Sequence, residues 1–364
     1  MPDYMKRAIQ LALRGRITCR PNPMVGAVIV KDGTVIGEGW HKVCGGPHAE
    51  RNAIADMKNR GFDAHGATLY VTLEPCCHYG RTAPCTDAII ENGFSKVIIG
   101  SRDPNPLVSG KGVKILQKAG IEVVQDYMKE ECDAINPVFF HYITTKTPYV
   151  TLKYAMTLDG KVATKTGASR WISGSDSLYL VHRLRNENYA IMVGSGTVLA
   201  DDPLLTSRIR GARNPIRIIC DSRLRIPLDC MLVNTATKIR TIVATTENNA
   251  ASPKAGDLKK AGVEVLSVGK GRQISLKILM EKLGQMEIDS LLLEGGPTLA
   301  GSALEEGLVN EIYIFIAPKI FGGKAKSPVE GLGVETPDSA YMFEVKSVKK
   351  VGNDILVISR KKES

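Results

Sequence analysis

Aromatic residues and long apolar runs are the scarcest features of this sequence. Only 5% of its 364 residues are aromatic, and two of these are tryptophan. No apolar run approaches the roughly 20 residues that span a bilayer. The first residues, MPDYMKRAIQLALRGRITCRPNP, interrupt their apolar positions with charged and amide side chains, as an amphipathic helix does and a signal peptide does not. We therefore expect a cytoplasmic protein that does not bind a membrane.

The sequence also has no block of like charge, no internal repeat and no low-complexity tract. Its 48 lysine and arginine residues exceed its 38 acidic ones, so the formal net charge is +10, but the basic residues are dispersed. A positive charge attracts anions of many kinds, whereas a nucleic-acid-binding arm concentrates that charge. The dispersed pattern favours small phosphorylated metabolites or nucleotide cofactors over nucleic acid.

Without a secretory signal, the eight cysteines are not expected to form a disulfide framework. Three of them lie in one stretch, EPCCHYGRTAPC, at residues 74–85. Cysteines clustered in this way in a cytosolic chain are typical of metal binding or catalysis. The other five are expected to be small buried apolar side chains: Cys19, Cys44, Cys132, Cys220 and Cys230.

The length of the chain exceeds what one hydrophobic core usually serves, so we expect two domains, at residues 1–146 and 147–364. Near the start, VGAVIVKDGTVIGEGW predicts a β-hairpin around the turn signal KDG, and alternating helices and strands follow it. This pattern indicates a three-layer α/β domain with a mixed sheet. A second alternation begins at YVTLKYAMTLDGK and predicts a second α/β domain.

One histidine and two cysteines occur in an order that is typical of a zinc site. His48 opens an expected helix, Cys76 follows an expected strand, and Cys85 opens another helix nine positions later. Three protein ligands leave the fourth zinc position to water, as a catalytic site requires. Glu50 lies two residues after His48, and H-x-E followed by P-C motifs is the pattern of zinc deaminases, in which the glutamate moves the proton.

The residues alone leave two other arrangements open. In one, His78 replaces His48 as a ligand and makes a compact structural clip; in the other, Cys76 and Cys77 form a buried pair at the end of a strand. In the second half, no G-x-G-x-x-G fingerprint follows the first strand. Two shorter glycine turns, at 194–196 and 294–298, follow apolar strands and are compatible with phosphate binding or with plain strand-to-helix turns.

Longer stretches resemble a known family. RPNPMVGAVIVKDG, GPHAERNAI, VTLEPCCHYGRTAPC and DPNPLVSGKG are similar to the deaminase half of the bifunctional RibD enzymes of riboflavin biosynthesis. TPYVTLKYAMTLDGK, GASRWISG, GSGTVLADDPLLTSR and LLLEGGPTLAGSALEEGLVNEIYIFIAPKIFGG are similar to the reductase half. The resemblance implies a cytidine-deaminase-like domain followed by a dihydrofolate-reductase-like domain.

For the first domain the resemblance implies one zinc ion bound by His48, Cys76 and Cys85, with Glu50 as the catalytic proton carrier. Cys77 stands where the family usually has serine. The implied reaction is hydrolytic deamination of 2,5-diamino-6-(5-phosphoribosylamino)pyrimidin-4(3H)-one by water that zinc activates. Further substrate contacts are expected in this pocket, at Asn22, His78 and Arg81.

For the second domain the resemblance implies hydride transfer from NADPH, which reduces the ribosyl group of the deaminated product to a ribityl chain. Cofactor contacts are expected at Ala155, Trp171, Thr197, Asp201, Ser222, Gly296, Pro297, Thr298, Leu299, Ala300, Gly301 and Ser302. Substrate contacts are expected at Ser169, Arg185, Leu205, Arg208 and Glu294. The family also implies a homodimer or homotetramer.

Several roles in the second domain stay open at this point. Lys153 and Asp159 are candidates for proton delivery to the sugar, and Arg183 or Arg223 for contact with the NADPH 2′-phosphate. Three rival hypotheses also remain. They are a tRNA-type zinc deaminase with an accessory nucleic-acid-binding domain, a zinc-stabilised scaffold without activity, and an enzyme with only one active site.

Overall fold

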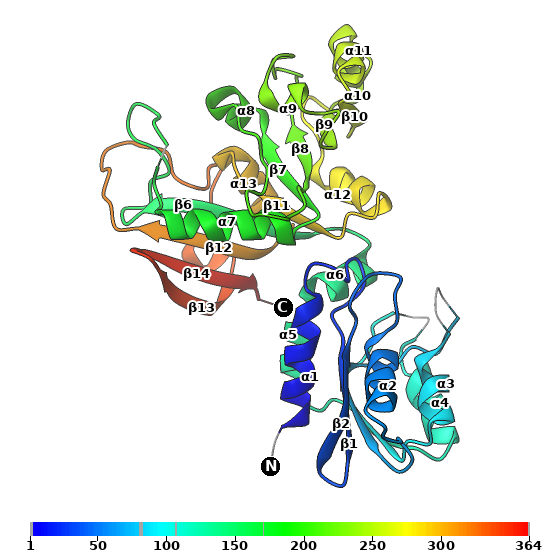
Figure 1. Cartoon of the computed structure of the whole chain (residues 1–364). Helices are drawn as coiled ribbons and strands as arrows, with labels where there is room; N and C mark the ends of the chain where they lie inside the picture. The colour runs from blue at the N-terminus through cyan, green and yellow to red at the C-terminus, as the bar shows by residue number, and fades with distance from the viewer. Residues whose placement is uncertain (1–2, 80–82, 106–107, 170, 363–364) are drawn as a thin grey trace. The chain divides into compact units, whose positions relative to one another are not determined.

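The computed structural model describes residues 3–79, 83–105, 108–169 and 171–362. The chain divides into two compact units, Met1–Thr145 and Lys146–Ser364, coloured from blue to cyan-green and from green to red in Figure 1. No helix among the described residues is long and apolar enough to cross a membrane.

The first unit is built on a five-stranded mixed sheet with the order β2-β1-β3-β4-β5. β1 and β2 form the expected hairpin, whose turn places Asp32 and Gly33 at positive φ. β1 also pairs antiparallel with β3, while β3, β4 and β5 run parallel. The strands are β1 (Gly26–Lys31), β2 (Thr34–Trp40), β3 (Thr68–Leu73), β4 (Lys96–Ser101) and β5 (Glu122–Val124).

Helices cover both faces of this sheet and complete the three layers (Figure 1). α2 (Ala49–Asn59), α3 (Cys85–Glu91) and α4 (Lys111–Lys118) bury their apolar side chains on one face. α1 (Tyr4–Ala12) and α5 (Lys129–Ala134) cover the other, and α6 (Pro137–Thr145) ends the unit. A short 3₁₀ turn, Leu13–Gly15, follows α1.

The close packing of α2 against the sheet depends on a glycine in β2. A Cβ atom on Gly39 would lie 2.3 Å from the backbone nitrogen of Ala53, well inside van der Waals contact. Only glycine therefore lets α2 approach the sheet so closely. This approach fixes the start of α2, where His48 is the N-cap residue and Glu50 belongs to the first turn.

The second unit is built on a nine-stranded sheet with the order β10-β9-β8-β7-β11-β6-β12-β14-β13. All neighbours from β10 to β12 are parallel, and β14 and β13 are antiparallel additions at one edge. The strands are β6 (Tyr149–Thr157), β7 (Ala190–Gly194), β8 (Ile216–Cys220), β9 (Thr241–Thr245), β10 (Glu264–Ser267), β11 (Ser290–Leu293), β12 (Val309–Ala317), β13 (Phe343–Val351) and β14 (Asp354–Lys361).

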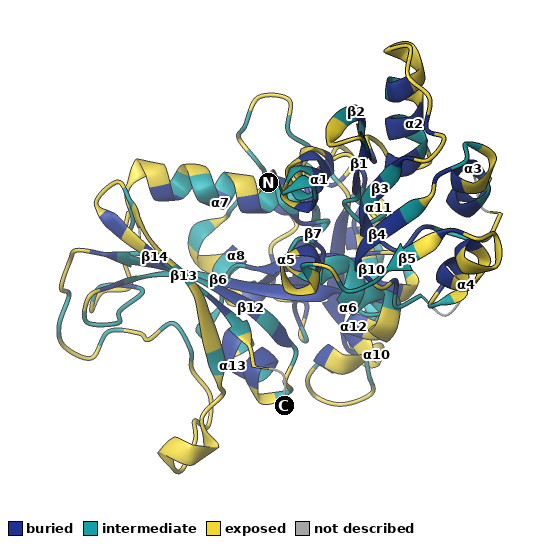
Figure 2. Ribbon diagram, turned by 90° about the horizontal axis from the view of Figure 1, so that it is seen from below, coloured by how far each residue is buried: buried dark blue, intermediate teal, exposed yellow. Residues whose placement is uncertain are grey.

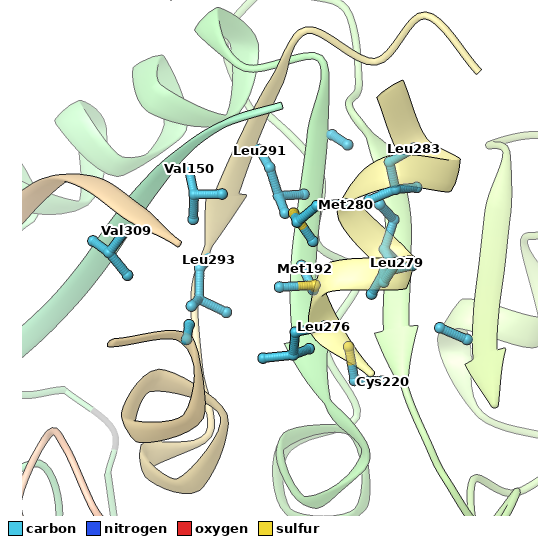
Figure 3. Close-up of a cluster of buried hydrophobic side chains, with 14 of the residues drawn as sticks. Val150, Met192, Cys220, Leu276, Leu279, Met280, Leu283, Leu291, Leu293 and Val309 are labelled. Atoms are coloured by element: carbon cyan, nitrogen blue, oxygen red, sulfur yellow. The ribbon is translucent and has the colours of Figure 1, made fainter. Parts of the chain in front are cut away.

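Two apolar clusters sandwich the parallel strands. α12 (Leu276–Gln285) and α13 (Pro297–Glu305) pack on one face, where Leu279, Leu283 and Met192 meet (Figure 3). The other face carries α7 (Ser175–Glu187), α8 (Ser195–Asp201), α9 (Met231–Asn234) and α11 (Pro253–Lys260). The short helix α10 (Glu247–Ala250) and the 3₁₀ turn Pro337–Ser339 complete the described elements. Because both faces are covered, the central strands are continuously apolar and buried, as Figure 2 shows for β7.

Candidate active sites of the two units

In the first unit the structure brings His48, Cys76 and Cys85 together. One ligand atom from each residue lies within 4.8 Å of the others. The Nδ1 atom of His48 is 3.4 Å from the Sγ atom of each cysteine. One imidazole and two thiols converging on a point are a donor set that zinc takes, with a fourth position left for a further ligand. The residues therefore fit a zinc ion.

Local structure at the ends of β3, α2 and α3 produces this convergence. The chain leaves β3 and turns at Pro75, so that the backbone oxygen of Cys76 accepts hydrogen bonds from the backbone N–H groups of Cys85 (3.0 Å) and Thr86 (3.2 Å). From α2, the guanidinium of Arg51 donates to the backbone oxygen of Pro84 at 2.9 Å. Both contacts tie the start of α3 to its neighbours, so the two cysteines meet although the sequence separates them.

The three side chains share their protons unequally. Hydrogen bonds from Cys85, and then from His48, lower the pKa of the Cys76 thiol far below its ordinary value. The same contact with Cys76, together with burial, raises the pKa of Cys85. The hydrogen bond to Cys76 also raises the pKa of His48. The cluster thus collects negative charge on sulfur, which a bound dication would neutralise.

Glu50 lies beside the cluster and is almost fully buried, with 3% of its surface exposed. Burial raises the pKa of its carboxyl, and the Cys85 thiol hydrogen-bonds to it. A raised pKa suits a group that takes up a proton and releases it again near neutral pH. Glu50 is therefore placed as a proton carrier next to the metal ligands.

In the second unit a charged cluster lies where β6, β11 and α7 meet. The guanidinium of Arg185 donates to both carboxylate oxygens of Glu294, each at 2.8 Å, and to the backbone oxygen of Thr206. The ammonium of Lys153 lies 4.0 Å from Glu294. Burial lowers the pKa of Lys153. Burial also opposes ionisation of Glu294, but Arg185 and Lys153 bring its pKa below the ordinary value.

The two glycine turns of the second unit lie against each other. A Cβ atom on Gly295 would be 3.1 Å from the hydroxyl oxygen of Thr197, and one on Gly296 would be 3.8 Å from the backbone nitrogen of Gly194. Both Gly295 and Gly296 have positive φ. The turn after β7 and the start of α13 are therefore close to each other beside Glu294, and a strand-to-helix turn of this kind can bind a phosphate.

Comparisons with known proteins agree with a zinc site in the first unit and a reductase site in the second. The cytidine and deoxycytidylate deaminase zinc-binding region matches residues 2–101, and the RibD C-terminal domain matches residues 148–357. The riboflavin biosynthesis protein RibD of Actinobacillus pleuropneumoniae is 53% identical over 357 residues, 98% of this chain and 94% of that protein. The RibD protein of Aquifex aeolicus (strain VF5) is 45% identical over 360 residues, with 99% and 98% covered.

A solved structure from Thermotoga maritima extends the similarity to the whole fold. It is described as a diaminohydroxyphosphoribosylaminopyrimidine deaminase/5-amino-6-(5-phosphoribosylamino)uracil reductase, with a TM-score of 0.87 and 40% identity. The match covers 99% of this chain and 98% of that chain. The chain belongs to the RibD family.

Membership of the RibD family confirms the fold class and both activities expected from the resemblance, which are a zinc-dependent deaminase and an NADPH-dependent reductase of riboflavin biosynthesis. The hypothesis of an accessory nucleic-acid-binding domain is wrong, because residues 148–357 match a reductase domain. The hypothesis of an inactive scaffold fails for the same reason.

The structure describes two of the three other predicted residues of the RibD deaminase pocket, Asn22 and His78. The amide nitrogen of Asn22 is 3.0 Å from Nε2 of His41, whose ring packs edge-on against that of His48. His78 is exposed, and Arg81 lies outside the described residues. The sequence reasoning missed Asp103 of the DPNP stretch, which is buried and whose pKa burial raises to about 6.

The predicted cofactor contacts of the RibD reductase are spread along the sheet. Ala155 is on β6, Thr197 and Asp201 are on α8, and Ser222 follows β8. Trp171 is exposed, and its backbone oxygen accepts a hydrogen bond from Lys319. Gly296 caps α13, and the first six residues of that helix complete the predicted set: Pro297, Thr298, Leu299, Ala300, Gly301 and Ser302.

The predicted substrate contacts also differ in exposure. Arg185 and Glu294 form the buried pair described above, Leu205 is buried with a positive φ, Ser169 is half-buried and Arg208 is exposed. Sequence reasoning missed His182 of α7, whose Nδ1 atom is buried without a hydrogen-bond partner among the described residues. A histidine inside a helical pattern gives no signal of this kind.

Asp159, a candidate for proton delivery, has its carboxylate held by nearby groups in the structure. Its carboxylate accepts hydrogen bonds from the hydroxyl of Thr157 and from the backbone N–H groups of Phe321 and Gly322. These bonds, that of Thr157 foremost, lower the pKa of Asp159 to about 2. These hydrogen bonds anchor the loop after β12, which carries Phe321 and Gly322, to Asp159.

Proposed function

We propose that the first unit deaminates 2,5-diamino-6-(5-phosphoribosylamino)pyrimidin-4(3H)-one and that the second reduces 5-amino-6-(5-phosphoribosylamino)uracil. The observation that carries this proposal is the convergence of His48, Cys76 and Cys85 beside the buried Glu50. We place the two domains at residues 1–146 and 147–364. The Thermotoga maritima relative, described as an enzyme with both activities, supports the choice of substrates.

In the first unit, His48, Cys76 and Cys85 would hold the metal and Glu50 would move protons. Zinc bound there supplies Lewis acidity, which makes water a nucleophile at neutral pH. Glu50 would take one proton from the attacking water and pass it to the ring nitrogen, while the water oxygen bonds to the ring carbon that carries the amino group. Glu50 would then carry the second proton of that water to the departing nitrogen, so that the C–N bond breaks, ammonia leaves and a carbonyl remains. Asn22 would orient the substrate, because His41 fixes its amide beside the site.

In the second unit, the predicted cofactor contacts on β6, on α8 and at the start of α13 would hold NADPH. The cofactor supplies the hydride that the C1′ carbon of the sugar receives. The proton that must accompany it comes from Lys153, which is buried, close to Glu294 and easier to deprotonate than a solvated lysine. Glu294 is held by Arg185 and so sets the position of Lys153 and of the sugar hydroxyls.

The product of the first reaction is the substrate of the second, so both sites must accept the same ribosyl phosphate. We propose Arg208 as an exposed phosphate contact, because a guanidinium offers paired donors. A cytoplasmic location is supported by the use of NADPH and by the free thiols of the metal cluster. We further propose a homodimer or homotetramer assembled through the second unit, which light scattering would test.

Product mass tests the function directly. The purified protein is incubated with the diaminopyrimidine ribosylamine phosphate, first without and then with NADPH. We expect a deaminated product to accumulate alone and to become the ribityl compound once NADPH is added. Deamination without subsequent reduction would contradict the assignment of the second unit. Failure to deaminate with zinc bound would contradict that of the first.

A further inference from the structure

A lysine that follows β12 holds the backbone at a predicted cofactor contact of the second unit. The ammonium of Lys319 donates hydrogen bonds to the backbone oxygens of Trp171 and Ile172, each at 2.8 Å. Lys319 and Trp171 are 148 residues apart in the sequence, so this contact exists only in the folded chain. A charged donor makes a stronger hydrogen bond than a neutral one, and here one ammonium serves two adjacent carbonyl groups.

The backbone around Lys319 is itself fixed to the end of β6. The carbonyl oxygen of Lys319 accepts a hydrogen bond from the N–H of Leu158 at 2.8 Å. Just beyond it, the N–H groups of Phe321 and Gly322 donate to the carboxylate of Asp159, at 3.2 and 2.7 Å. β6 and β12 are parallel neighbours in the sheet. The ammonium therefore extends from a segment that the sheet holds in place, so its two hydrogen bonds fix the backbone that it contacts relative to the sheet.

The Trp171 side chain is 65% exposed, so packing does little to fix its ring. Among the described residues, Lys319 is the only one whose side chain hydrogen-bonds to the backbone of Trp171 or Ile172. Farther along the chain, the N–H of Gly174 donates to the buried carboxylate of Asp354 at 2.8 Å. Without Lys319 the ring would sample more conformations, and ordering it against a ligand would cost conformational entropy.

We infer that Lys319 is a positioning residue of the reductase, which holds the backbone at Trp171 and Ile172 so that the indole ring is in place before NADPH binds. The inference rests on the proposed function, in which Trp171 contacts the cofactor. Lys319 acts through Trp171 and takes no part in transferring the hydride or the proton. Its removal should therefore weaken the binding of NADPH and leave the rate at saturating cofactor nearly unchanged.

Fluorescence tests the inference, because Trp171 is one of only two tryptophans in the chain. The other, Trp40, lies on β2 of the first unit, and Trp40→Phe removes it to give the reference protein. Three variants are made in this reference. Lys319→Met keeps the apolar stem without a donor, Lys319→Arg keeps a charged donor, and Lys324→Met removes an exposed lysine of the same loop. The melting temperature of the second unit shows that each variant is folded.

In the free protein, Lys319→Met should increase the nanosecond motion of Trp171, measured by the decay of its fluorescence anisotropy. Quenching of Trp171 by NADPH should give a dissociation constant about 10-fold above that of the reference protein, because charge-assisted hydrogen bonds are lost. Lys319→Arg should stay within about 3-fold of the reference, since a guanidinium can also donate to two carbonyl oxygens. Lys324→Met should match the reference in both measurements. In reductase kinetics, Lys319→Met should raise the KM for NADPH and change kcat by less than about 2-fold.

Three outcomes would overturn the inference. An unchanged dissociation constant in Lys319→Met would show that NADPH binding does not depend on this contact. Weaker binding with unchanged motion of Trp171 would show that Lys319 acts without Trp171, as it would by contacting the cofactor itself. An equal effect of Lys324→Met would show that the charge of the loop matters and not the two hydrogen bonds.

A further variant separates this inference from the proposed function on which it rests. Trp171→Ala should bind NADPH more weakly than wild type in calorimetry, because it removes the ring that Lys319 positions. Equal binding by this variant would show that Trp171 is not a cofactor contact, which would count against the proposed function as well as the inference. Weaker binding by Trp171→Ala together with unchanged binding by Lys319→Met would overturn the inference alone.

Discussion

The two charged centres of this molecule differ in whether the protein alone completes them. In the second unit, the Glu294 carboxylate meets Arg185 at 2.8 Å and Lys153 at 4.0 Å, so its negative charge is balanced by fixed side chains. In the first unit, the side chains of His48, Cys76 and Cys85 hydrogen-bond one another, and no lysine or arginine forms an ion pair with them among the described residues. Its thiols compete for protons, because each hydrogen-bonds the other.

This difference shows how each site is prepared for its reaction. In the first site, hydrogen bonds of the backbone and of Arg51 bring together three donor side chains that fit an added zinc ion. The second site holds its polar groups by ion pairing between Glu294, Arg185 and Lys153. Loss of one charged group should therefore have different consequences in the two units.

The largest expected effect separates the two activities. Glu50→Gln keeps the size of the side chain but removes the proton carrier, so deamination should slow by about 10³- to 10⁴-fold. Reduction of the deaminated pyrimidine supplied directly should be unchanged, since Glu50 belongs to the first unit. Zinc content and both rates are measured. Glu91→Gln, an exposed carboxyl of α3, is the matched control, and an equal loss in that variant would contradict the role of Glu50.

Metal removal should distinguish the stabilities of the two units. A chelator leaves the thiols of Cys76 and Cys85 and the imidazole of His48 without their shared cation, so the melting temperature of the first unit should fall by about 10 °C or more. The transition of the second unit should not move. Calorimetry with and without added zinc measures both transitions.

Cysteine variants make the metal prediction residue-specific. Cys85→Ser should lose bound zinc, whereas Cys77→Ser should retain it, because Cys77 is not among the three convergent ligands. Metal content by atomic absorption decides between them. Retention of zinc by the first variant would show that the metal is held in another way.

The second unit should be destabilised by a change at its ion pair. Glu294→Gln removes the negative charge that balances Arg185 and Lys153, both of which are largely buried. An unbalanced buried cation costs about 3 kcal/mol, so the second unit should unfold at lower temperature and lose reductase activity. Deamination should be unaffected. Glu305→Gln, on α13, serves as the control, and a destabilised first unit would contradict this separation.

The sequence predicted local structure, such as turns, better than contacts between residues that are far apart in the chain. The hairpin at Asp32 and Gly33 was predictable because its turn residues adopt positive φ easily. The metal ligands were predictable as a motif, but their spacing alone could not place His48 against Cys76. That contact depends on the close packing of α2 against Gly39 and on the hydrogen bond that Arg51 donates to the backbone oxygen of Pro84.

The sheet of the second unit shows more clearly that the sequence does not reveal contacts between distant residues. An alternation of strands and helices indicates parallel strands, but it does not reveal that β11 inserts between β7 and β6. That insertion brings Glu294 to Arg185, which is 109 residues away in the sequence.

The smallest expected effect concerns a buried carboxyl without the cationic partners that Glu294 has. Burial raises the pKa of Asp103 to about 6 from an ordinary value of 3.8. Below pH 4 the carboxyl is protonated in both the folded and the unfolded chain. Between pH 4 and 6 the folded chain retains a proton that the unfolded chain has lost, so the free energy of unfolding falls as pH rises, by at most about 3 kcal/mol.

Asp103→Asn removes this titration while its side-chain oxygen can still accept the hydrogen bond from the backbone of Asn105. The variant should therefore match wild type near pH 4 and become more stable than wild type as pH rises through 6, by about 2 kcal/mol at pH 7. Thermal unfolding of the first unit across this range measures the difference, and Asp63→Asn, at an exposed site, is the control. A constant difference between the two curves would mean that Asp103 is ionised throughout, and would place it with Glu294 among the carboxylates that have a compensating charge.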